Sequence, residues 1–237
     1  MACSQAVHAE IQPDTITVFA AASLRDAVGE VALQYTAETG TDVVLVFAAT
    51  SAIARQVVGA APADVALLAD QDWANWLVGQ GTVAQVTAFA GNQLVLIGRD
   101  HAPIANPQEI EAALGDGVLA MAQVAAVPAG RYGKAAMVSL GLWDSVAARV
   151  VQAANVRAAL RFVELGEAPL GIGYASDLVA LPALTQVYAF APDTHPYIIY
   201  SAAQVTPKGA EFMAYLHSVA AQDTLVQWGF SRLVVAQ

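Results

Sequence analysis

Hydroxyl-bearing and small residues stand at several points where a predicted strand gives way to a predicted helix. They are Ser23, Thr50-Ser51, Ala129, Val156 and, at the end of a strand, Tyr174. The first backbone N–H groups of a helix have no partner within the helix and lie at the positive end of its dipole, and a hydroxyl adds one more donor. Residues of these types can therefore bind an anion, although Ser23 or Thr50 taken alone is equally explained as an ordinary helix N-cap.

The stretch around Ser23 illustrates how the sequence builds such a junction. An apolar run over residues 16–20 predicts a buried strand, and small residues separate it from Ser23. The residues that follow recur with helical spacing, and Asp26 three positions on completes a pattern that resembles a capping box. We therefore expect Ser23 to be the N-cap of a helix that ends near Gly40.

Alternation of strand and helix continues along the whole chain. Predicted strands lie at residues 16–20, 42–47, 63–69, 92–98, 117–123, 169–174, 187–190 and 197–205, with helices between most of them. This order predicts an α/β fold in which mostly parallel sheets are flanked by helices. The strand–helix units fall into two sets of similar size, and two extended segments, here called crossings, join the sets. This arrangement predicts two lobes with a hinge and a cleft between them.

The two crossings divide the chain into its predicted domains. Residues 10–87 together with 198–237 form the first lobe, and residues 88–197 form the second. Ligands of open α/β sheets bind beyond the carboxyl ends of the strands, where helix starts point. Two lobes that face each other would aim several such helix starts at one place, and this convergence favours a ligand site over isolated N-caps.

Composition excludes some classes of partner. The 237 residues are 57% hydrophobic and 13% charged, which is typical of a globular protein with a large core. A formal net charge of −10 argues against nucleic acid, because no basic patch is available to neutralise phosphates. The same charge gives no long-range attraction for an anion, so an anion site here must act through local dipoles.

The first nine residues have features of an export signal. Val7-His8-Ala9 has the small-x-small pattern of a signal-peptidase site, so residues 1–9 are interpreted as the remnant of such a signal and the protein as periplasmic. Cys3 is the only cysteine, and lipidation of Cys3 in a longer precursor is an alternative. A natural N-terminus without either feature is a third interpretation.

Catalytic and metal-binding motifs are not found in the sequence. The four histidines do not have metal-ligand spacing, and no G-x-S-x-G elbow occurs. Residues 130–135 resemble part of a phosphate-binding loop but lack its first glycine and its final Ser or Thr, and residues 171–176 lack the third glycine of a dinucleotide fingerprint. We therefore expect a protein that is not an enzyme and has no cofactor, and we interpret these glycines as turn or packing residues.

Six segments, in order from Ile16 to Phe230, carry a resemblance to a known family. They are ITVFAAASLRDA, FAATSAIARQ, GAAPADVALLADQDW, VPAGRYGKAA, NVRAALRFVELGEAPLGIGYASD and WGF. They are similar to the periplasmic molybdate-binding proteins of bacterial ABC transporters, which are type II periplasmic binding proteins. The resemblance implies that fold, a monomer that binds molybdate or tungstate, and delivery of the ion to a membrane permease.

The resemblance also implies the ligand set. The family's first serine corresponds to Ser23, and its second corresponds to Thr50, where this chain keeps the hydroxyl and adds a methyl group. Ala129 and Val156 would act through their backbone N–H groups, and Tyr174 through its hydroxyl. Ser51 is a possible additional ligand if the alignment slips by one residue. Molybdenum or tungsten would be bound only as the oxyanion, through its oxygen atoms, and no protein atom would coordinate the metal directly.

Such a donor set suits a tetrahedral dianion, which accepts hydrogen bonds but cannot donate them. Protonated phosphate is disfavoured because its P–OH meets another donor, whereas sulfate can be rejected only by size. Three alternatives stay open: a binding protein for another oxyanion such as sulfate, a cleft enzyme of the transferase type, and the sensing domain of a regulator. The transferases that share this fold attach a cofactor through a cysteine, and Cys3 lies outside the predicted lobes.

Overall fold

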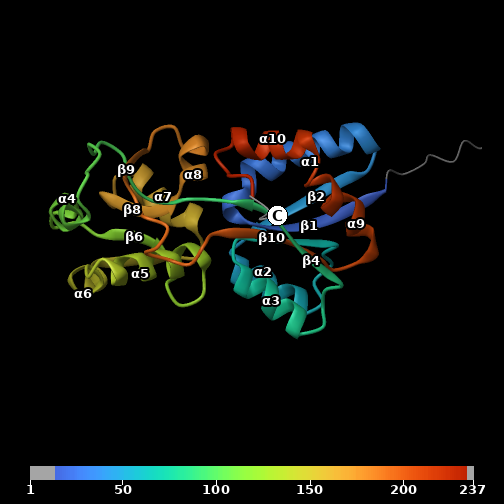
Figure 1. The fold of residues 1–237 in the computed structure, drawn as a ribbon, viewed down its shortest axis with the longest axis horizontal. Helices are drawn as coiled ribbons and strands as arrows, with labels where there is room; N and C mark the ends of the chain where they lie inside the picture. Colours follow the sequence, from blue (N-terminus) through green and yellow to red (C-terminus); the bar gives the residue numbers. More distant parts are fainter. Residues whose placement is uncertain (1–13, 234–237) are drawn as a thin grey trace, which may run out of the picture.

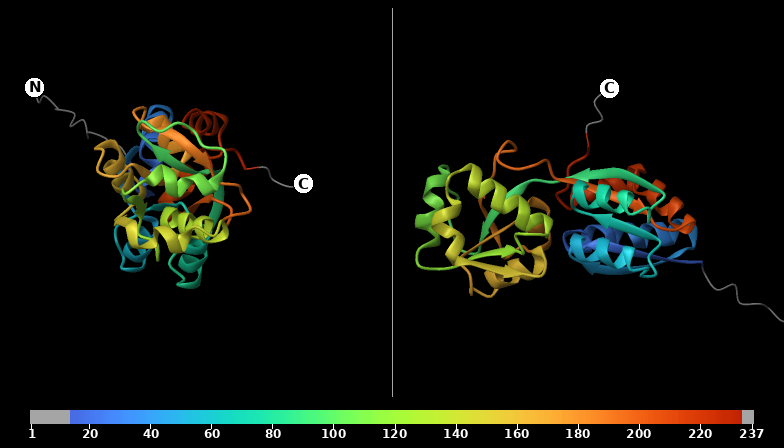
Figure 2. Two further views of the ribbon diagram at one scale, coloured as in Figure 1. Left: turned by 90° about the vertical axis from the view of Figure 1, so that its left-hand side faces the viewer. Right: turned by 90° about the horizontal axis from the view of Figure 1, so that it is seen from below.

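The computed structural model describes residues 14–233 and contains two lobes, each built on a five-stranded sheet (Figure 1). Cys3 and the interpreted export remnant at residues 1–9 lie outside the described residues. Seen from below, two extended segments connect the lobes (Figure 2). The two-lobed α/β fold predicted from the sequence is confirmed.

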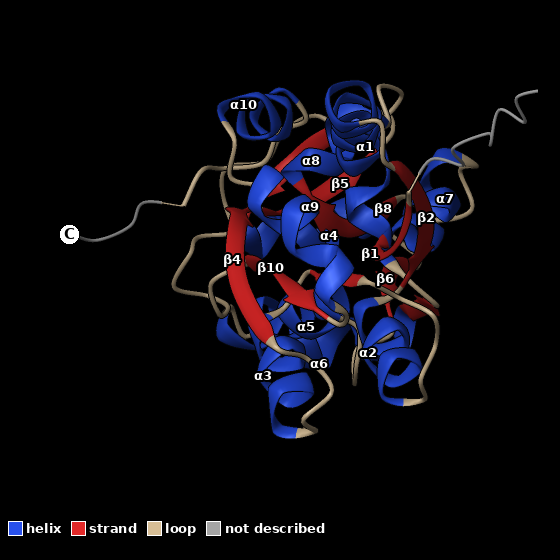
Figure 3. Cartoon of the chain, turned by 90° about the vertical axis from the view of Figure 1, so that its right-hand side faces the viewer, coloured by secondary structure: helices blue, strands red, loops and turns tan. Residues whose placement is uncertain are grey.

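The first lobe contains both ends of the described chain. Its strands are β1 (Thr15–Ala21), β2 (Asp42–Ala48), β3 (Val65–Leu68), β4 (Gln85–Gly91) and β10 (Ile199–Gln204). Its helices are η1 (Ala22–Leu24), α1 (Arg25–Thr39), α2 (Thr50–Val58), α3 (Gln71–Gly79), η4 (Pro207–Gly209), α9 (Ala210–Tyr215) and α10 (Val219–Gln227). Helices α1 and α10 cover one face of the sheet, and α2 and α3 cover the other (Figure 3).

The second lobe repeats the same plan. Its strands are β5 (Leu94–Gly98), β6 (Leu119–Ala122), β7 (Val150–Ala153), β8 (Leu170–Tyr174) and β9 (Thr185–Ala189). Its helices are η2 (Pro107–Glu109), α4 (Ile110–Leu114), α5 (Pro128–Ser139), α6 (Trp143–Val146), η3 (Ala147–Arg149), α7 (Val156–Glu164) and α8 (Ala175–Ala180).

Strand order is equivalent in the two sheets. The first runs β2-β1-β3-β10-β4 and the second β7-β6-β8-β5-β9, and in each sheet four strands point one way while the fourth in order is reversed. The reversed strands, β10 and β5, are the first strands that the chain forms after each crossing. The parallel strands of each lobe consequently end at the edge that faces the other lobe.

Two strands that the sequence did not predict, β4 and β7, lie at sheet edges. Strand β7 has four residues and none of them is fully buried, and β4 is buried only in its last three residues. Edge strands are covered by neighbours less completely, so they need no continuous apolar run, and this run was the signal used to predict strands.

Close packing of helices on the second sheet explains its glycines. The side chain of Ile172 on β8 points toward α5, where an added Cβ on Gly133 would lie 3.0 Å from it. Added Cβ atoms on Gly171 and Gly173 would lie 2.8 and 2.9 Å from side chains of α7. Because alternate residues of a strand face opposite sides, α5 and α7 cover opposite faces of the second sheet. The interpretation of these glycines as packing residues is confirmed.

We expect the substitution Gly130→Ala to destabilise the protein by about 1–3 kcal/mol, the usual effect of an overpacked contact. Gly130 is in the first turn of α5, and an added Cβ would lie 2.2 Å from the carbonyl oxygen of Ala122 and 2.6 Å from that of Gln123. These atoms belong to the backbone at the end of β6, so α5 would have to move away. Urea unfolding midpoints measure the effect.

Gly29→Ala is the matched control. Gly29 lies within α1, and no atom lies within 4 Å of an added Cβ. Alanine there should stabilise the protein by about 0.5–1 kcal/mol, because glycine in a helix interior loses more conformational freedom on folding. Similar midpoints for both variants would contradict the role of the Gly130 contact.

Candidate anion-binding site

A small cavity lies between the lobes, where the parallel strands of both sheets end. Its lining residues are Ala21, Ala22, Ser23, Ala49, Thr50 and Ala69 from the first lobe and Val127, Pro128, Ala129, Asn155, Val156 and Tyr174 from the second. They follow the carboxyl ends of β1, β2 and β3 on one side and of β6, β7 and β8 on the other. Three strand-to-helix junctions from each lobe therefore converge on one point.

All five residues of the predicted ligand set line this cavity, and all are buried. Ser51, the possible additional ligand, is also buried but does not line the cavity. No charged side chain belongs to the cavity lining in the part of the chain that the structure describes. The cavity is small, with about 10 Å³ open to the centre of a water molecule.

Ser23 is not the helix N-cap that the sequence predicted. It lies within the single 3₁₀ turn η1, and α1 begins after it at Arg25 without any side-chain cap. Its Oγ lies 2.9 Å from the hydroxyl of Tyr200 on β10. The 3₁₀ turn places Ser23 at the cavity wall, and its hydroxyl is not used to cap α1.

Thr50 is the first residue of α2, and Ala49 rather than Thr50 is its N-cap. The backbone N–H of Ala69 donates to Thr50 Oγ1 at 3.1 Å. A hydroxyl that accepts from an N–H keeps its own proton for another acceptor. The hydroxyl of Thr50 can therefore donate into the cavity.

Tyr174 ends β8 and is the N-cap residue of α8. Its backbone N–H donates to Asp177 Oδ2 at 3.0 Å, and its buried hydroxyl oxygen has no hydrogen-bond partner among residues 14–233. Burial raises the pKa of the Tyr174 phenol well above its ordinary value, with the nearby Tyr200 as the next cause. The phenol is therefore neutral, and its hydroxyl proton is available for donation into the cavity that Tyr174 lines.

Backbone donors come from the starts of α5 and α7. Pro128 is the first residue of α5 and has no N–H, so Ala129 supplies the first N–H of that helix. Val156 is the first residue of α7, and Asn155 caps this helix by accepting from the N–H of Ala158 at 2.9 Å. The N–H groups of Ala129 and Val156 have no partner within their helices and lie at the positive ends of the helix dipoles.

Ion pairs on either side of the cavity join the lobes. Arg157 of α7 contacts Asp26 of α1 at 2.8 Å and Asp177 of α8 at 2.6 Å. Arg131 of α5 contacts Asp70 at 2.8 Å and Asp72 at 2.6 Å.

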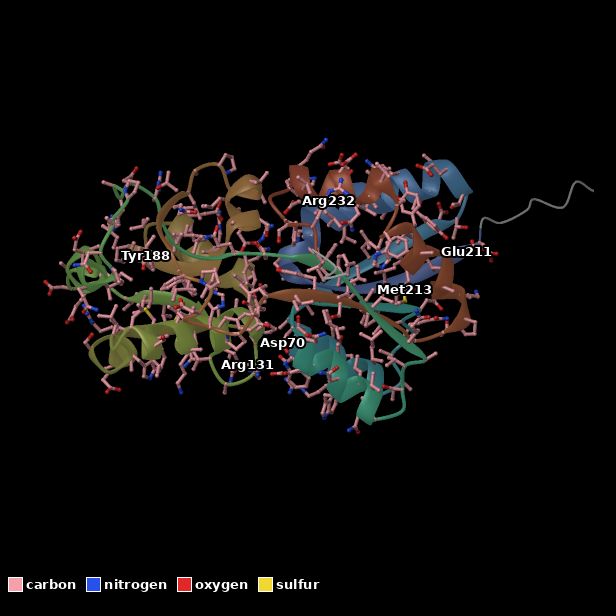
Figure 4. All side chains as sticks on the ribbon, viewed as in Figure 1. Asp70, Arg131, Tyr188, Glu211, Met213 and Arg232 are labelled. Carbon is pink, nitrogen blue, oxygen red and sulfur yellow. The ribbon has the colours of Figure 1, made fainter. Side chains whose placement is uncertain are left out.

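Both arginines therefore reach from the second lobe to carboxylates of the first. Figure 4 shows Asp70 and Arg131 together at the boundary between the lobes. A third link is the indole N–H of Trp73, which donates to the carbonyl of Ala126 at 2.9 Å. No pattern in the sequence predicts these contacts between the lobes, because the partners are dozens of residues apart along the chain.

The described residues hold no cluster of three or more His, Cys, Asp or Glu side chains that could bind a metal ion. None of their helices is long and apolar enough to cross a membrane.

Comparison with known proteins gives a consistent result. A model of the bacterial extracellular solute-binding protein family matches residues 16–231. The molybdate-binding protein ModA of Escherichia coli (strain K12) is 38% identical over 231 residues, which cover 91% of this chain and 88% of that protein. The ModA protein of Haemophilus influenzae is 37% identical over 228 residues, covering 91% and 89%.

The fold agrees with a solved structure as well. The periplasmic molybdate-binding protein of Azotobacter vinelandii superposes with a TM-score of 0.83 over 94% of this chain and 100% of that one, at 23% sequence identity. With its two lobes, its cavity between helix starts and these relatives, the chain belongs to the bacterial extracellular solute-binding proteins, in the ModA group of periplasmic molybdate-binding proteins.

Proposed function

We propose that this protein captures molybdate, and also tungstate, in the cavity between its lobes and delivers the ion to the membrane permease of an ABC importer. Its ModA relatives are named as molybdate-binding proteins and support this proposal. The observation that carries it is a buried, uncharged cavity whose polar groups are hydrogen-bond donors supplied by both lobes. The protein acts as a monomer outside the inner membrane, as a binding protein without a cofactor and not as an enzyme.

The donors are matched to a fully deprotonated oxyanion. Thr50 and Tyr174 each have a hydroxyl proton free for the ligand, and Ala129 and Val156 supply N–H groups. Each oxygen of molybdate can accept from such groups. The P–OH of a protonated phosphate would face a donor instead of an acceptor, and a buried mismatch of this kind costs about 1–3 kcal/mol.

Helix dipoles and not full charges would balance the anion. The nearby arginines are engaged with carboxylates, and the protein carries a formal net charge of −10. Partial charges at helix starts act over a short range and depend on direction. The cavity would therefore select by the position of each oxygen, and size would separate molybdate from the smaller sulfate.

Closure of the lobes would trap the ion. The contacts of Arg157 and Arg131 across the boundary indicate that the structure is in a closed arrangement. An ion enclosed by donors from both lobes can leave only when these contacts break. The surfaces of both lobes would then present the loaded state to the permease.

Removing a ligand hydroxyl should weaken molybdate binding. We expect Ser23→Ala and Thr50→Val to raise the dissociation constant about 10-fold or more, because each variant loses one donor to a charged acceptor. Thr50→Ser keeps the hydroxyl and should bind nearly as well as the wild type. Isothermal titration calorimetry with molybdate measures all three.

Ser51→Ala is the control for these variants, because Ser51 is buried next to Thr50 without lining the cavity. Its affinity should be unchanged. Loss of binding in Ser51→Ala together with full binding in Thr50→Val would assign the ligand role to Ser51.

Competition tests the identity of the anion. We expect tungstate to displace bound molybdate, and sulfate or phosphate to displace it only at far higher concentration, because sulfate leaves donors unsatisfied and protonated phosphate brings an extra donor. The measurement is displacement calorimetry at neutral pH. Tight binding of sulfate with no binding of molybdate would favour the sulfate alternative instead.

Weakening one interlobe ion pair should accelerate release of the ion. Asp26→Asn removes the charge that Arg157 contacts in the other lobe and keeps the contact with Asp177. We expect the dissociation rate to rise about 2- to 5-fold, in the range of partly exposed ion pairs. Stopped-flow fluorescence measures the rate, and Asp223→Asn, which removes an exposed ion pair with Arg232 in the first lobe, should leave it unchanged.

A further inference from the structure

Tyr200 is a fully buried tyrosine behind the cavity wall and is not one of the lining residues. It lies on β10, the strand that carries the chain from the second lobe back to the first (Figure 1). Its hydroxyl is 2.9 Å from Oγ of Ser23, and either oxygen could be the donor in this pair. The direction of this hydrogen bond decides whether Ser23 can offer a proton to an anion.

Asn92, in the other crossing, determines that direction. Its Oδ1 accepts from the backbone N–H of Gln93 at 2.9 Å, which orients the side-chain amide. Its Nδ2 consequently faces the hydroxyls of Ser176 at 2.8 Å and Tyr200 at 3.4 Å and donates to both. The oxygen of Tyr200 is therefore an acceptor toward Asn92. Among residues 14–233, Ser23 Oγ is the acceptor within hydrogen-bond distance of the Tyr200 proton, and a buried proton without an acceptor is unfavourable, so this proton is directed to Ser23.

The phenol remains neutral, so this proton is present throughout the physiological range. Burial raises the pKa of Tyr200 well above its ordinary value. Once Ser23 Oγ accepts from Tyr200, the Ser23 proton has no internal acceptor in the part of the chain that the structure describes, and it is directed at the cavity.

We propose that Tyr200 is a positioning residue for specificity: it donates to Ser23, fixes the Ser23 hydroxyl as a donor toward the ligand, and so disfavours oxyanions that carry a proton. This inference rests on the proposed function, in which the cavity binds a tetrahedral oxyanion. Without Tyr200, the Ser23 hydroxyl could turn and accept from a P–OH group. The chain of hydrogen bonds therefore runs from Asn92 in one crossing through Tyr200 in the other crossing to Ser23.

The hydroxyl of Tyr200 can be removed without removing its packing. The ring contacts those of Phe230, Tyr174 and Phe89 edge to face, with centroid distances of 5.2, 6.1 and 6.3 Å. Phenylalanine keeps these contacts, so Tyr200→Phe isolates the hydrogen bond from the fold. Thermal unfolding of the variant verifies that the fold is intact.

A double-mutant cycle with Ser23→Ala tests the proposal. We expect Tyr200→Phe to weaken molybdate binding about 2- to 10-fold, the range of one hydrogen bond, and to have no further effect when Ser23 is already alanine. We also expect the ratio of phosphate to molybdate dissociation constants to fall about 5-fold or more in Tyr200→Phe at neutral pH. A general loss of structure would weaken both anions equally and leave that ratio unchanged.

Two further variants make the outcome decisive. Tyr35→Phe, at a buried tyrosine of α1 outside the cavity, should change neither affinity nor ratio. Asn92→Ala removes the donor that orients Tyr200 and should lower the ratio in the same direction. The inference would be overturned if Tyr200→Phe weakened molybdate binding equally in the wild type and in the Ser23→Ala variant. It would also be overturned if the ratio of phosphate to molybdate dissociation constants stayed unchanged in both Tyr200→Phe and Asn92→Ala.

The proposed function and the role of Tyr200 fail in distinguishable ways. If the wild type binds sulfate and not molybdate, the proposed function is wrong, and the same cycle with sulfate still tests Tyr200. If the wild type binds molybdate and the cycle shows independent effects, the function stands and the role of Tyr200 is wrong.

Discussion

The cavity depends on one constraint: the polar groups that line it must point hydrogen-bond donors into the cavity, because none of its lining side chains is charged. Hydroxyls can donate or accept, so the surrounding structure has to decide for them. The N–H of Ala69 does this for Thr50, and in our proposal the phenol of Tyr200 does it for Ser23. The helix starts need no such help, since their N–H groups can only donate. In our proposal, a site built this way distinguishes anions by their own protons as well as by their charge.

The same constraint explains where the charged residues are. Arg131 and Arg157 lie within two residues of Ala129 and Val156, yet each is held by two carboxylates. Asp70 and Asp177, one partner of each arginine, are almost completely buried. A free guanidinium at this position would attract any anion, whereas a paired one links the lobes and leaves selection to the directional donors. The ion pairs therefore link the two lobes, and in our proposal the helix dipoles recognise the anion.

Much of the fold could be predicted because its signals are local. Apolar runs predicted most strands of both sheets. The edge strands β4 and β7 were not predicted, since they are only partly buried and lack a continuous apolar run. Ser23 was wrongly predicted as an N-cap: the capping pattern is present in the sequence, but a 3₁₀ turn precedes α1 and the hydroxyl faces Tyr200. A local pattern cannot include a partner 177 residues away.

By itself the sequence determined that the chain forms strand-to-helix junctions in two lobes, and its motifs indicated which residues stand at the ends of the strands. Those features depend on the spacing of apolar residues and on residues that are neighbours in the sequence, so they can be recognised without the tertiary structure. Only the tertiary structure decided that the six junctions meet at one cavity, that Arg131 and Arg157 bridge the lobes, and that Asn92 and Tyr200 stand behind Ser23. These contacts join residues from distant segments, and hydrogen-bond direction exists only once donor and acceptor have been brought together in space.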